Sequence, residues 1–457
     1  MRTEYMGEAV SAANTVYERL IDEYQKNRKA IEVDFRKMVD WIPYGNRASH
    51  SIHLYPAKLL PHIPILFISN EYLSAEQDTV FDPFCGSGTV PLESLLFNRK
   101  SVAADANPLA RLVTKVKTSE ISADRLNSAY SNLRKRILST APSDNFPNVT
   151  NIDYWFHPHV KLQLNHIKES ISKMRSNELK DFFNVAFSNT IKKVSLADPM
   201  VSVPVKLNSL RYSVDSEHYK RAIKAIEKIK NIDVYNKFYQ MVELNIKHLN
   251  NFTELRKEYN GNDSALIYDD ARKLEIDGRL QPSNSVQLIV TSPPYAGAQK
   301  YVRSASLNMG WLGYCESNVL RDFDKKTIGR EHYSKGEYEV LPKTGVVDAD
   351  LLLRKIAKKN VQRGYIAANY LIEMRAAFEE SHRILKYGGY FVLVIGNNTV
   401  CGFEFLTSNY LRTILESLGF ILELDLIDHI HSRGLMTKRN KTAGMIASES
   451  VMVFRKI

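Results

Sequence analysis

A run of ten residues decides the fold: Val80-Phe81-Asp82-Pro83-Phe84-Cys85-Gly86-Ser87-Gly88-Thr89. Its first half is apolar, as expected for a strand, and its second half is a glycine-rich turn. A helical pattern over residues 90–97 begins directly after the turn. Gly86 and Gly88 allow the backbone to approach a ligand closely, and Thr89 can cap the helix. Because glycine turns also simply connect strands to helices, the cofactor interpretation needs a second signal.

That signal is an acid at the end of the next strand candidate, residues 101–105. Asp105 follows the glycine turn by about 20 residues, where a doubly wound fold places the carboxylate that binds ribose hydroxyls. The alternative is a turn-forming acid before Asn107-Pro108. No Walker-type Lys follows the glycines, which argues against a nucleoside triphosphate. Together these features favour a ribose-bearing cofactor.

Apolar runs alternate with helical patterns outward from this region, which is the signature of a parallel sheet with helices on both faces. Residues 12–40 are expected to form a charged amphipathic helix. The last two runs carry polar residues between apolar ones, as an antiparallel edge pair often does. The seven strand candidates are residues 79–84, 101–105, 265–268, 286–290, 390–395, 420–427 and 450–454.

A proline-rich loop, Thr291-Ser292-Pro293-Pro294-Tyr295, follows the strand candidate at residues 286–290. Two prolines fix φ and remove backbone donors, so the loop is rigid and its carbonyl oxygens are free. The Ser292 hydroxyl and the Pro293 carbonyl can accept hydrogen bonds from a planar amino group. Tyr295 offers a flat face on which a base can stack. An isolated Pro-Pro turn is common at strand ends, but a loop that follows a glycine-loop cofactor site favours a functional role.

The glycine loop and the Ser-Pro-Pro-Tyr tetrapeptide together resemble the two signature motifs of amino-group DNA methyltransferases. In that family the first motif holds S-adenosylmethionine and the second holds the amino group of the target base. The resemblance implies an α/β, Rossmann-like S-adenosylmethionine-dependent methyltransferase fold, with a seven-stranded, mostly parallel sheet and a large helical insertion. Ser before Pro-Pro-Tyr is typical of N4-cytosine enzymes, and Asp or Asn of N6-adenine enzymes, so Ser292 favours cytosine.

Other stretches are similar to further segments of the family. The run His53-Leu54-Tyr55-Pro56-Ala57-Lys58 resembles the additional cofactor segment beside the methionine end. Either Asp269 or Asp270 would reach the adenine amine of the cofactor, and we prefer Asp270. The resemblance implies catalytic roles for Ser292, Pro293, Pro294 and Tyr295. It implies cofactor-binding roles for Tyr55, Pro56, Ala57, Asp82, Pro83, Phe84, Gly86, Gly88, Thr89, Asp105, Ala106, Asp270, Ala271 and Thr291.

The long gap between the second and third strand candidates reads as mostly helical. Residues 121–262 hold 22 Lys and Arg against 14 Asp and Glu, so this stretch carries 8 of the 11 net positive charges of the chain. These basic faces could simply be solvated, but we favour a region that binds a polyanion. The expected division is an N-terminal helical segment (1–46), a cofactor-binding part (47–119), a basic candidate target-recognition insertion (120–262) and an active-site part (263–457).

Composition and cysteine usage limit the remaining possibilities. The chain is 44% hydrophobic and 25% charged, as in ordinary soluble proteins, and no stretch reaches the roughly 20 apolar residues of a membrane span. Cys85, Cys315 and Cys401 form no zinc or disulfide pattern and suit a reducing cytoplasm. No Asp or Cys completes a metal set around His157 and His159, or around His429 and His431, so we expect no metal.

The main expectation is methylation of the N4 of cytosine in double-stranded DNA, with the target base flipped out of the stack. The resemblance also makes a companion restriction endonuclease plausible, whereas the oligomeric state stays open. The first alternative is N6-adenine methylation of DNA. More distant alternatives are an RNA amino-methyltransferase and a DNA-binding subunit without catalytic activity, although Gly86, Gly88, Asp105 and the intact tetrapeptide argue against the latter.

Overall fold

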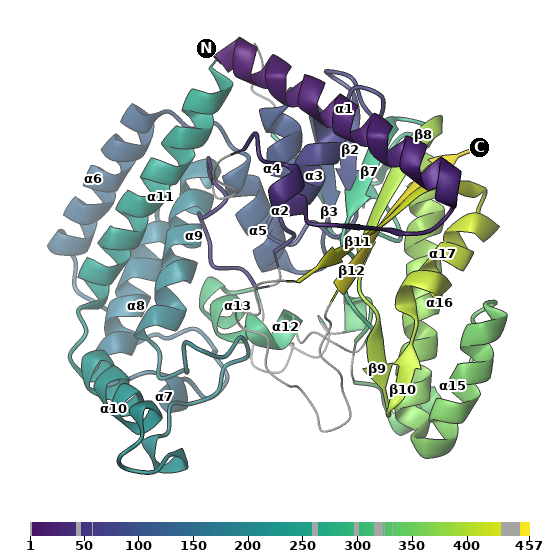
Figure 1. Cartoon of the computed structure of the whole chain (residues 1–457). Helices are drawn as coiled ribbons and strands as arrows, with labels where there is room; N and C mark the ends of the chain where they lie inside the picture. The colour runs from purple at the N-terminus through teal and green to yellow at the C-terminus, as the bar shows by residue number, and fades with distance from the viewer. Residues whose placement is uncertain are drawn as a thin grey trace.

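An eight-stranded sheet forms the centre of the protein (Figure 1). The structure, a computed structural model, describes residues 2–42, 47–56, 58–257, 264–296, 301–314, 323, 325–330, 332–430 and 448–457. In sheet order the strands are β1 (Ile31–Val33), β11 (Phe420–His429), β12 (Ser448–Lys456), β8 (Leu385–Ile395), β7 (Val286–Thr291), β2 (Thr79–Asp82), β3 (Lys100–Ala104) and β4 (Leu266–Tyr268). Only β12 runs opposite to the others.

All seven predicted strands lie in this sheet, but the expected single helix over residues 12–40 is wrong. Helix α1 (Arg2–Asn27) ends early, and β1 and the short helix α2 (Phe35–Met38) follow it. The alternation of β-branched Ile31 and Val33 with Glu32 suits a strand, and β1 pairs in parallel with residues 426–428 of β11.

The expected edge pair is also corrected. Strands β11 and β12 are antiparallel to each other, as predicted, but neither forms the edge of the sheet. Strand β1 covers β11, and β12 pairs with β8 on its other side. The apolar residues of β12, Val451 to Phe454, are buried because the strand lies inside the sheet.

Helices cover both faces of the sheet. One layer consists of α1, α3 (His62–Ile68), α4 (Thr89–Leu96) and α5 (Pro108–Lys117), and the other of α15 (Val347–Lys359), α16 (Val361–Ile384) and α17 (Thr407–Ser417) (Figure 1). The core between the layers includes the fully buried side chains of Phe81, Leu288, Phe378 and Phe391. The fold is therefore α/β and Rossmann-like, with a mostly parallel sheet, as expected, but the sheet has eight strands and not the predicted seven, because β1 adds to it.

Six helices follow α5 in the chain and gather on one side of the molecule (Figure 1). They are α6 (Ala123–Ser139), α7 (Ile152–Trp155), α8 (Pro158–Ser172), α9 (Asn177–Val194), α10 (Glu217–Lys230) and α11 (Val234–Arg256). Side chains of Ser122, Ser176, Ser216 and Asp233 cap four of them. The apolar faces of α6, α8, α9 and α11 share one core with α4, α5 and α13 (Ser306–Leu312), in which Trp311 is fully buried.

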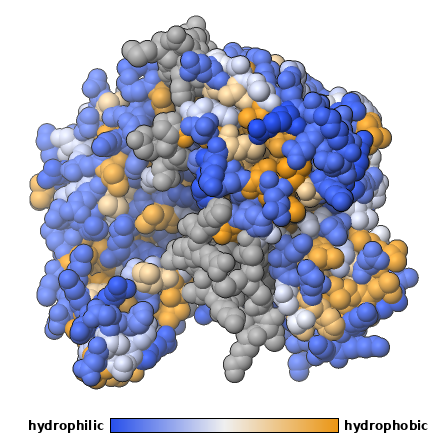
Figure 2. Space-filling model, in the orientation of Figure 1, coloured by the Kyte–Doolittle hydropathy of each residue, from blue (hydrophilic) through white to orange (hydrophobic). Residues whose placement is uncertain are grey.

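The two ends of this helical region meet beside α4. Arg256, at the end of α11, pairs with Glu120 at 2.5 Å and donates to the Leu95 carbonyl of α4 at 2.9 Å. Figure 2 shows a largely hydrophilic surface over these helices. Among the helices that the structure describes, none has the length and apolar composition of a membrane span.

The smaller elements lie near the ends of the sheet or in connections. They are β5 (Glu275–Ile276), β6 (Arg279–Leu280), β9 (Asn398–Val400), β10 (Phe403–Phe405), α12 (Tyr301–Ser304), η1 (Ser209–Arg211) and η2 (Lys335–Tyr338). Strands β2, β3, β4 and β7 are parallel, so their carboxyl ends reach the same edge of the sheet. In open α/β sheets this edge is where ligands bind.

Candidate active site

The glycine loop turns tightly between β2 and α4. Gly88 has a φ of +74°, and a Cβ at this position would lie 2.7 Å from the Thr114 hydroxyl oxygen, so only glycine fits. The Cys85 amide donates to the Ala104 carbonyl at 2.9 Å and ties the loop to β3. The expectation that Thr89 caps α4 is wrong, because Gly88 is the N-cap and Thr89 is the first helical residue.

Asp105 lies beside this loop, at the end of β3. Its carboxylate accepts hydrogen bonds from the amides of Gly86 at 2.9 Å and Asn107 at 2.7 Å. Burial raises the pKa of Asp105, and these two donors act in the opposite direction. A carboxylate offers about four acceptor positions, so two remain for hydroxyl groups of a ligand.

Asp82, at the end of β2, connects the glycine loop to the proline loop. Its Oδ1 accepts from the Thr291 hydroxyl at 2.7 Å and from the Phe84 amide at 3.0 Å. Burial raises the pKa of Asp82 to about 7. Asp82 and Thr291 are both buried, so this pair fixes the ends of β2 and β7 relative to each other and does not line a cavity.

The proline loop continues from β7 and is held at its far end. The Asn398 side chain, from β9, donates to the Ala296 carbonyl at 2.5 Å. The Tyr295 hydroxyl donates a short hydrogen bond to Glu449 at the start of β12. Burial raises the pKa of Glu449. The loop therefore has fixed ends, and Tyr295 is anchored through its hydroxyl.

A cavity of about 710 Å³, including the part open to solvent, lies between the two loops. Ten of the predicted site residues line it: Tyr55, Pro83, Phe84, Gly86, Asp105, Ala106, Asp270, Ala271, Ser292 and Pro294. Seven further predicted site residues do not line the cavity: Asp82, Gly88, Thr89 and Thr291, which lie behind its walls, and Pro56, Pro293 and Tyr295. The remaining one, Ala57, lies outside the described residues.

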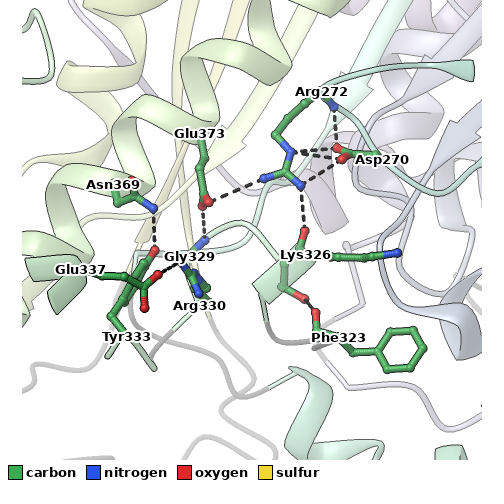
Figure 3. A network of polar contacts seen from close by, with 11 residues as sticks. Asp270, Arg272, Phe323, Lys326, Gly329, Arg330, Tyr333, Glu337, Asn369 and Glu373 are labelled. Carbon is green, nitrogen blue, oxygen red and sulfur yellow. Dashed lines mark hydrogen bonds and ion pairs between the residues drawn. The ribbon is translucent and has the colours of Figure 1, made fainter. Parts of the chain in front are cut away.

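Between the two acids considered after β4, the geometry favours Asp270. Asp270 lines the cavity, whereas Asp269 is exposed and does not. The Arg272 guanidinium binds the Asp270 carboxylate through Nε at 2.9 Å and through Nη2 at 2.9 Å (Figure 3). This fork-like contact fixes the orientation of the carboxylate.

Five lining residues were not expected from the sequence. They are Asn107, Val302, Lys326, Thr327 and Ile328. Asn107 could have been found from its position two residues after Asp105; its side chain donates to the Tyr55 hydroxyl at 3.1 Å and joins the additional cofactor segment to the site. Lys326 to Ile328 belong to no motif, so nothing in the sequence signals their approach.

The Cys85 thiol and the His157–His159 pair, two other candidates for chemistry, lie in surroundings that suit structural roles. Burial raises the pKa of the Cys85 thiol well above its usual range, so Cys85 is a packing residue with a poorly reactive thiol. The rings of His157 and His159 lie nearly parallel with their centroids 6.1 Å apart. Within the described residues, no group of three or more His, Cys, Asp or Glu side chains is arranged to hold a metal ion.

The donor set of the cavity fits a ribose-bearing cofactor. Asp105 supplies acceptors for hydroxyl groups, Asp270 supplies acceptors for an amino group, and Tyr55, Phe84 and Ile328 supply apolar surface. Together with the topology of the sheet, this cavity fits the cofactor site of a Rossmann-like methyltransferase fold.

Comparisons with known proteins narrow this class. Residues 71–153, which include the glycine loop and Asp105, match a family described as "RMKL-like, methyltransferase domain". The type II methyltransferase M.MvaI of Kocuria varians is 26% identical over 372 residues, which cover 77% of each chain. The type II methyltransferase M.BsoBI of Geobacillus stearothermophilus is 23% identical over 441 residues, which cover 84% of this chain and 81% of the relative.

These matches confirm the resemblance to DNA methyltransferases: the chain is similar to type II methyltransferases over most of its length and to a methyltransferase domain over residues 71–153. Among solved structures, the rRNA methyltransferase aviRa from Streptomyces viridochromogenes is 9% identical with a TM-score of 0.31, and the match covers 88% of each chain. That likeness is too distant to carry an argument about function.

Proposed function

We propose that this protein is an S-adenosylmethionine-dependent DNA methyltransferase of a restriction-modification system, and that it methylates the N4 amino group of cytosine. The single observation that carries the proposal is the shared cavity, in which the glycine loop and Asp105 face Ser292 and Pro294. The relationship to type II methyltransferases supports the DNA substrate and a companion endonuclease. Ser292, in place of Asp or Asn, favours cytosine over adenine.

The proposed reaction divides the work between the two loops. S-adenosylmethionine supplies a methyl group that its positive sulfur already activates. Asp105, Asp270 and the glycine loop bind and orient this cofactor. An exocyclic amine is a poor nucleophile because its lone pair is delocalised into the ring, so acceptors at Ser292 and Pro293 must polarise its N–H bonds. The rigid loop holds the amine in line with the methyl group, and Tyr295 supports the flipped base.

The helical insertion is the proposed DNA-binding region. Lys193 of α9 lies within electrostatic reach of Lys237 of α11 and Lys228 of α10: partial burial lowers the pKa of Lys193, and the charges of Lys237 and Lys228 lower it further. Lys206 lies 4.2 Å from the centre of the Tyr154 ring, which is half exposed. We call Tyr154, Lys193, Lys206, Lys228 and Lys237 the basic patch. A lysine beside an exposed aromatic ring, together with three further lysines on the same helical insertion, suits a nucleic-acid backbone.

The test uses labelled S-adenosylmethionine with duplex DNA and, in parallel, with RNA. Each product is digested to nucleosides and analysed by mass spectrometry. N4-methylcytosine is the expected product. N6-methyladenine would identify the alternative target base, and label in RNA alone would contradict the proposed substrate. Absence of both transfer and cofactor binding would favour a non-catalytic DNA-binding protein.

A further inference from the structure

Residues 326–328 form one wall of the cavity, and charged side chains hold this wall from outside (Figure 3). Lys326, Thr327 and Ile328 line the cavity. Close to this wall, a Cβ at Gly329 would lie 3.4 Å from the Tyr370 ring and 3.9 Å from the Tyr295 carbonyl oxygen. The wall therefore extends from the predicted cofactor site to the proline loop.

Arg272 joins this wall to the acid that faces it. Its guanidinium holds the Asp270 carboxylate, as described above, and its Nη2 also donates to the Lys326 carbonyl at 3.1 Å. One planar side chain thus fixes two groups of the cavity: an acceptor for a ligand amine, and the backbone of the opposite wall. Arginine suits this position because its five N–H donors point in fixed directions.

Glu373, on α16, completes the arrangement from the other side. Its Oε2 accepts from the Gly329 amide at 3.2 Å, and its Oε1 lies 3.6 Å from Nη1 of Arg272. The side chain is only 14% exposed. Burial raises the pKa of Glu373, while the Gly329 amide, Arg272 and Arg330 lower it and Asp270 raises it. A carboxylate so enclosed depends on these partners.

The same helix anchors the chain beyond the wall. The Asn369 side chain donates to the Tyr333 hydroxyl at 2.6 Å, and the Arg330 guanidinium lies 3.8 Å from the centre of the Tyr333 ring. Arg330 also pairs with Glu337 at 2.7 Å. Helix α16 therefore provides a rigid base, and Glu373 is the side chain through which it binds the Gly329 amide.

We infer that Arg272 and Glu373 are positioning residues of the cofactor site, which set cofactor affinity by fixing residues 326–328 and the Asp270 carboxylate around the ligand. The inference rests on the proposed function, because it takes S-adenosylmethionine as the occupant of the cavity. Neither side chain lines the cavity, so each acts through the groups that it holds.

The experiment measures binding of S-adenosylmethionine and S-adenosylhomocysteine by isothermal titration calorimetry, with the full chain and without DNA. Glu373→Gln, which keeps an acceptor for the Gly329 amide but removes the charge opposite Arg272, should weaken binding about tenfold. Arg272→Met loses the contacts with Asp270, the Lys326 carbonyl and Glu373, and should weaken binding about 30-fold or more. The double variant should be little worse than Arg272→Met alone, because both changes break one network.

Glu379→Gln is the matched control, since Glu379 is an exposed acid on the same helix. It should bind both ligands as tightly as the wild type. With cofactor at saturation, Glu373→Gln should keep its kcat and its KM for DNA within about twofold, whereas general misfolding would lower kcat as well.

Ile328→Ala leaves the charged pair intact and tests the wall itself; it should also weaken binding. Wild-type affinity in Glu373→Gln, Arg272→Met and Ile328→Ala, each checked for folding by circular dichroism, would overturn the inference. Failure of the wild type to bind either ligand would instead overturn the proposed function. The two failures are therefore distinguishable.

Discussion

The cavity region and the helical insertion treat charge in opposite ways. Around the cavity, the acids Asp82, Asp105 and Glu373 are enclosed, and each accepts hydrogen bonds from fixed donors. In the insertion, Lys193 and Lys228 are exposed and lie near other lysines. Enclosed and paired groups supply fixed geometry, whereas exposed like charges supply salt-dependent attraction to a polyanion. Chemistry and DNA affinity should therefore be separable by mutation.

The largest expected effect is loss of methyl transfer in Ser292→Ala and Tyr295→Ala. The first removes an acceptor for the target amine, and the second removes the surface that supports the base. Each should lower kcat by about a thousandfold or more, because alignment contributes much of the rate. Calorimetry should show nearly unchanged cofactor affinity, since Tyr295 does not line the cavity and Ser292 lies on its proline-loop side.

Tyr387→Ala provides the control for these two variants. Tyr387 is 71% exposed on β8, and its loss should leave the transfer rate near that of the wild type. A full rate in Tyr295→Ala would contradict the proposed position of the target base.

The next largest expected effect is on the pH dependence of protein stability, and it comes from Asp82 in the cavity region. Burial raises the pKa of Asp82 to about 7, whereas the unfolded chain titrates near its ordinary value of about 4. Between these pH values the folded protein keeps a proton that the unfolded chain has lost. The contribution of the protonated Asp82 carboxyl to the free energy of unfolding is therefore complete at low pH, and it disappears as the pH rises through about 7.

Asp82→Asn cannot ionise, so it should gain stability relative to the wild type as the pH rises, on the order of 2–4 kcal/mol by pH 8. Urea unfolding at pH 5, 6, 7 and 8 measures the difference. The exposed acid Asp40 serves as the comparison, and Asp40→Asn should show no such trend. A constant difference between Asp82→Asn and the wild type would show that burial does not control this carboxyl.

The sequence predicts the sheet better than it predicts the cavity walls. Long apolar runs and the glycine loop identify seven strands and the first acid, because burial on both faces leaves a continuous apolar signal. Strand β1 has only three residues, too few to produce an alternating pattern that can be distinguished from the helical pattern before it. Lys326 to Ile328 reach the cavity only through contacts with Arg272 and Glu373, which are far apart in sequence. Such tertiary contacts leave no local pattern.

A third prediction changes affinity in the insertion and leaves the chemistry intact. Replacement of Lys193, Lys228 and Lys237 together by Ala should weaken DNA binding about 10- to 100-fold at physiological salt, because three phosphate contacts are lost. The slope of log K against log salt concentration should become less negative by about 2–3. The kcat at saturating DNA and the cofactor affinity should not change.

Lys355→Ala with Lys358→Ala, on α15, is the control for surface charge outside the insertion. This pair should leave both DNA affinity and the salt slope close to wild type. An equal loss in the control would mean that net charge, and not the basic patch, attracts the DNA.

The smallest expected effect tests how strictly the cavity region fixes its geometry. The Tyr295 hydroxyl donates to Glu449, so Tyr295→Phe removes this contact while it keeps the ring that supports the base. Glu449→Ala removes the acceptor, and Glu449→Gln keeps one. The first two changes should each lower kcat about fivefold to tenfold, and Glu449→Gln should lower it less, because an uncharged acceptor still orients the ring.

The double variant distinguishes a Glu449 that orients the Tyr295 ring from a Glu449 that only stabilises β12. If Glu449 acts only by holding the Tyr295 hydroxyl, then Tyr295→Phe with Glu449→Ala should be no slower than either single variant, with a coupling of about 1 kcal/mol. If Glu449 only stabilises β12, Glu449→Ala should lower the free energy of unfolding and leave kcat unchanged. Additive losses in kcat would contradict the proposed contrast between the cavity region and the insertion. The ring that supports the base would then be held no more firmly than the surface lysines of the insertion.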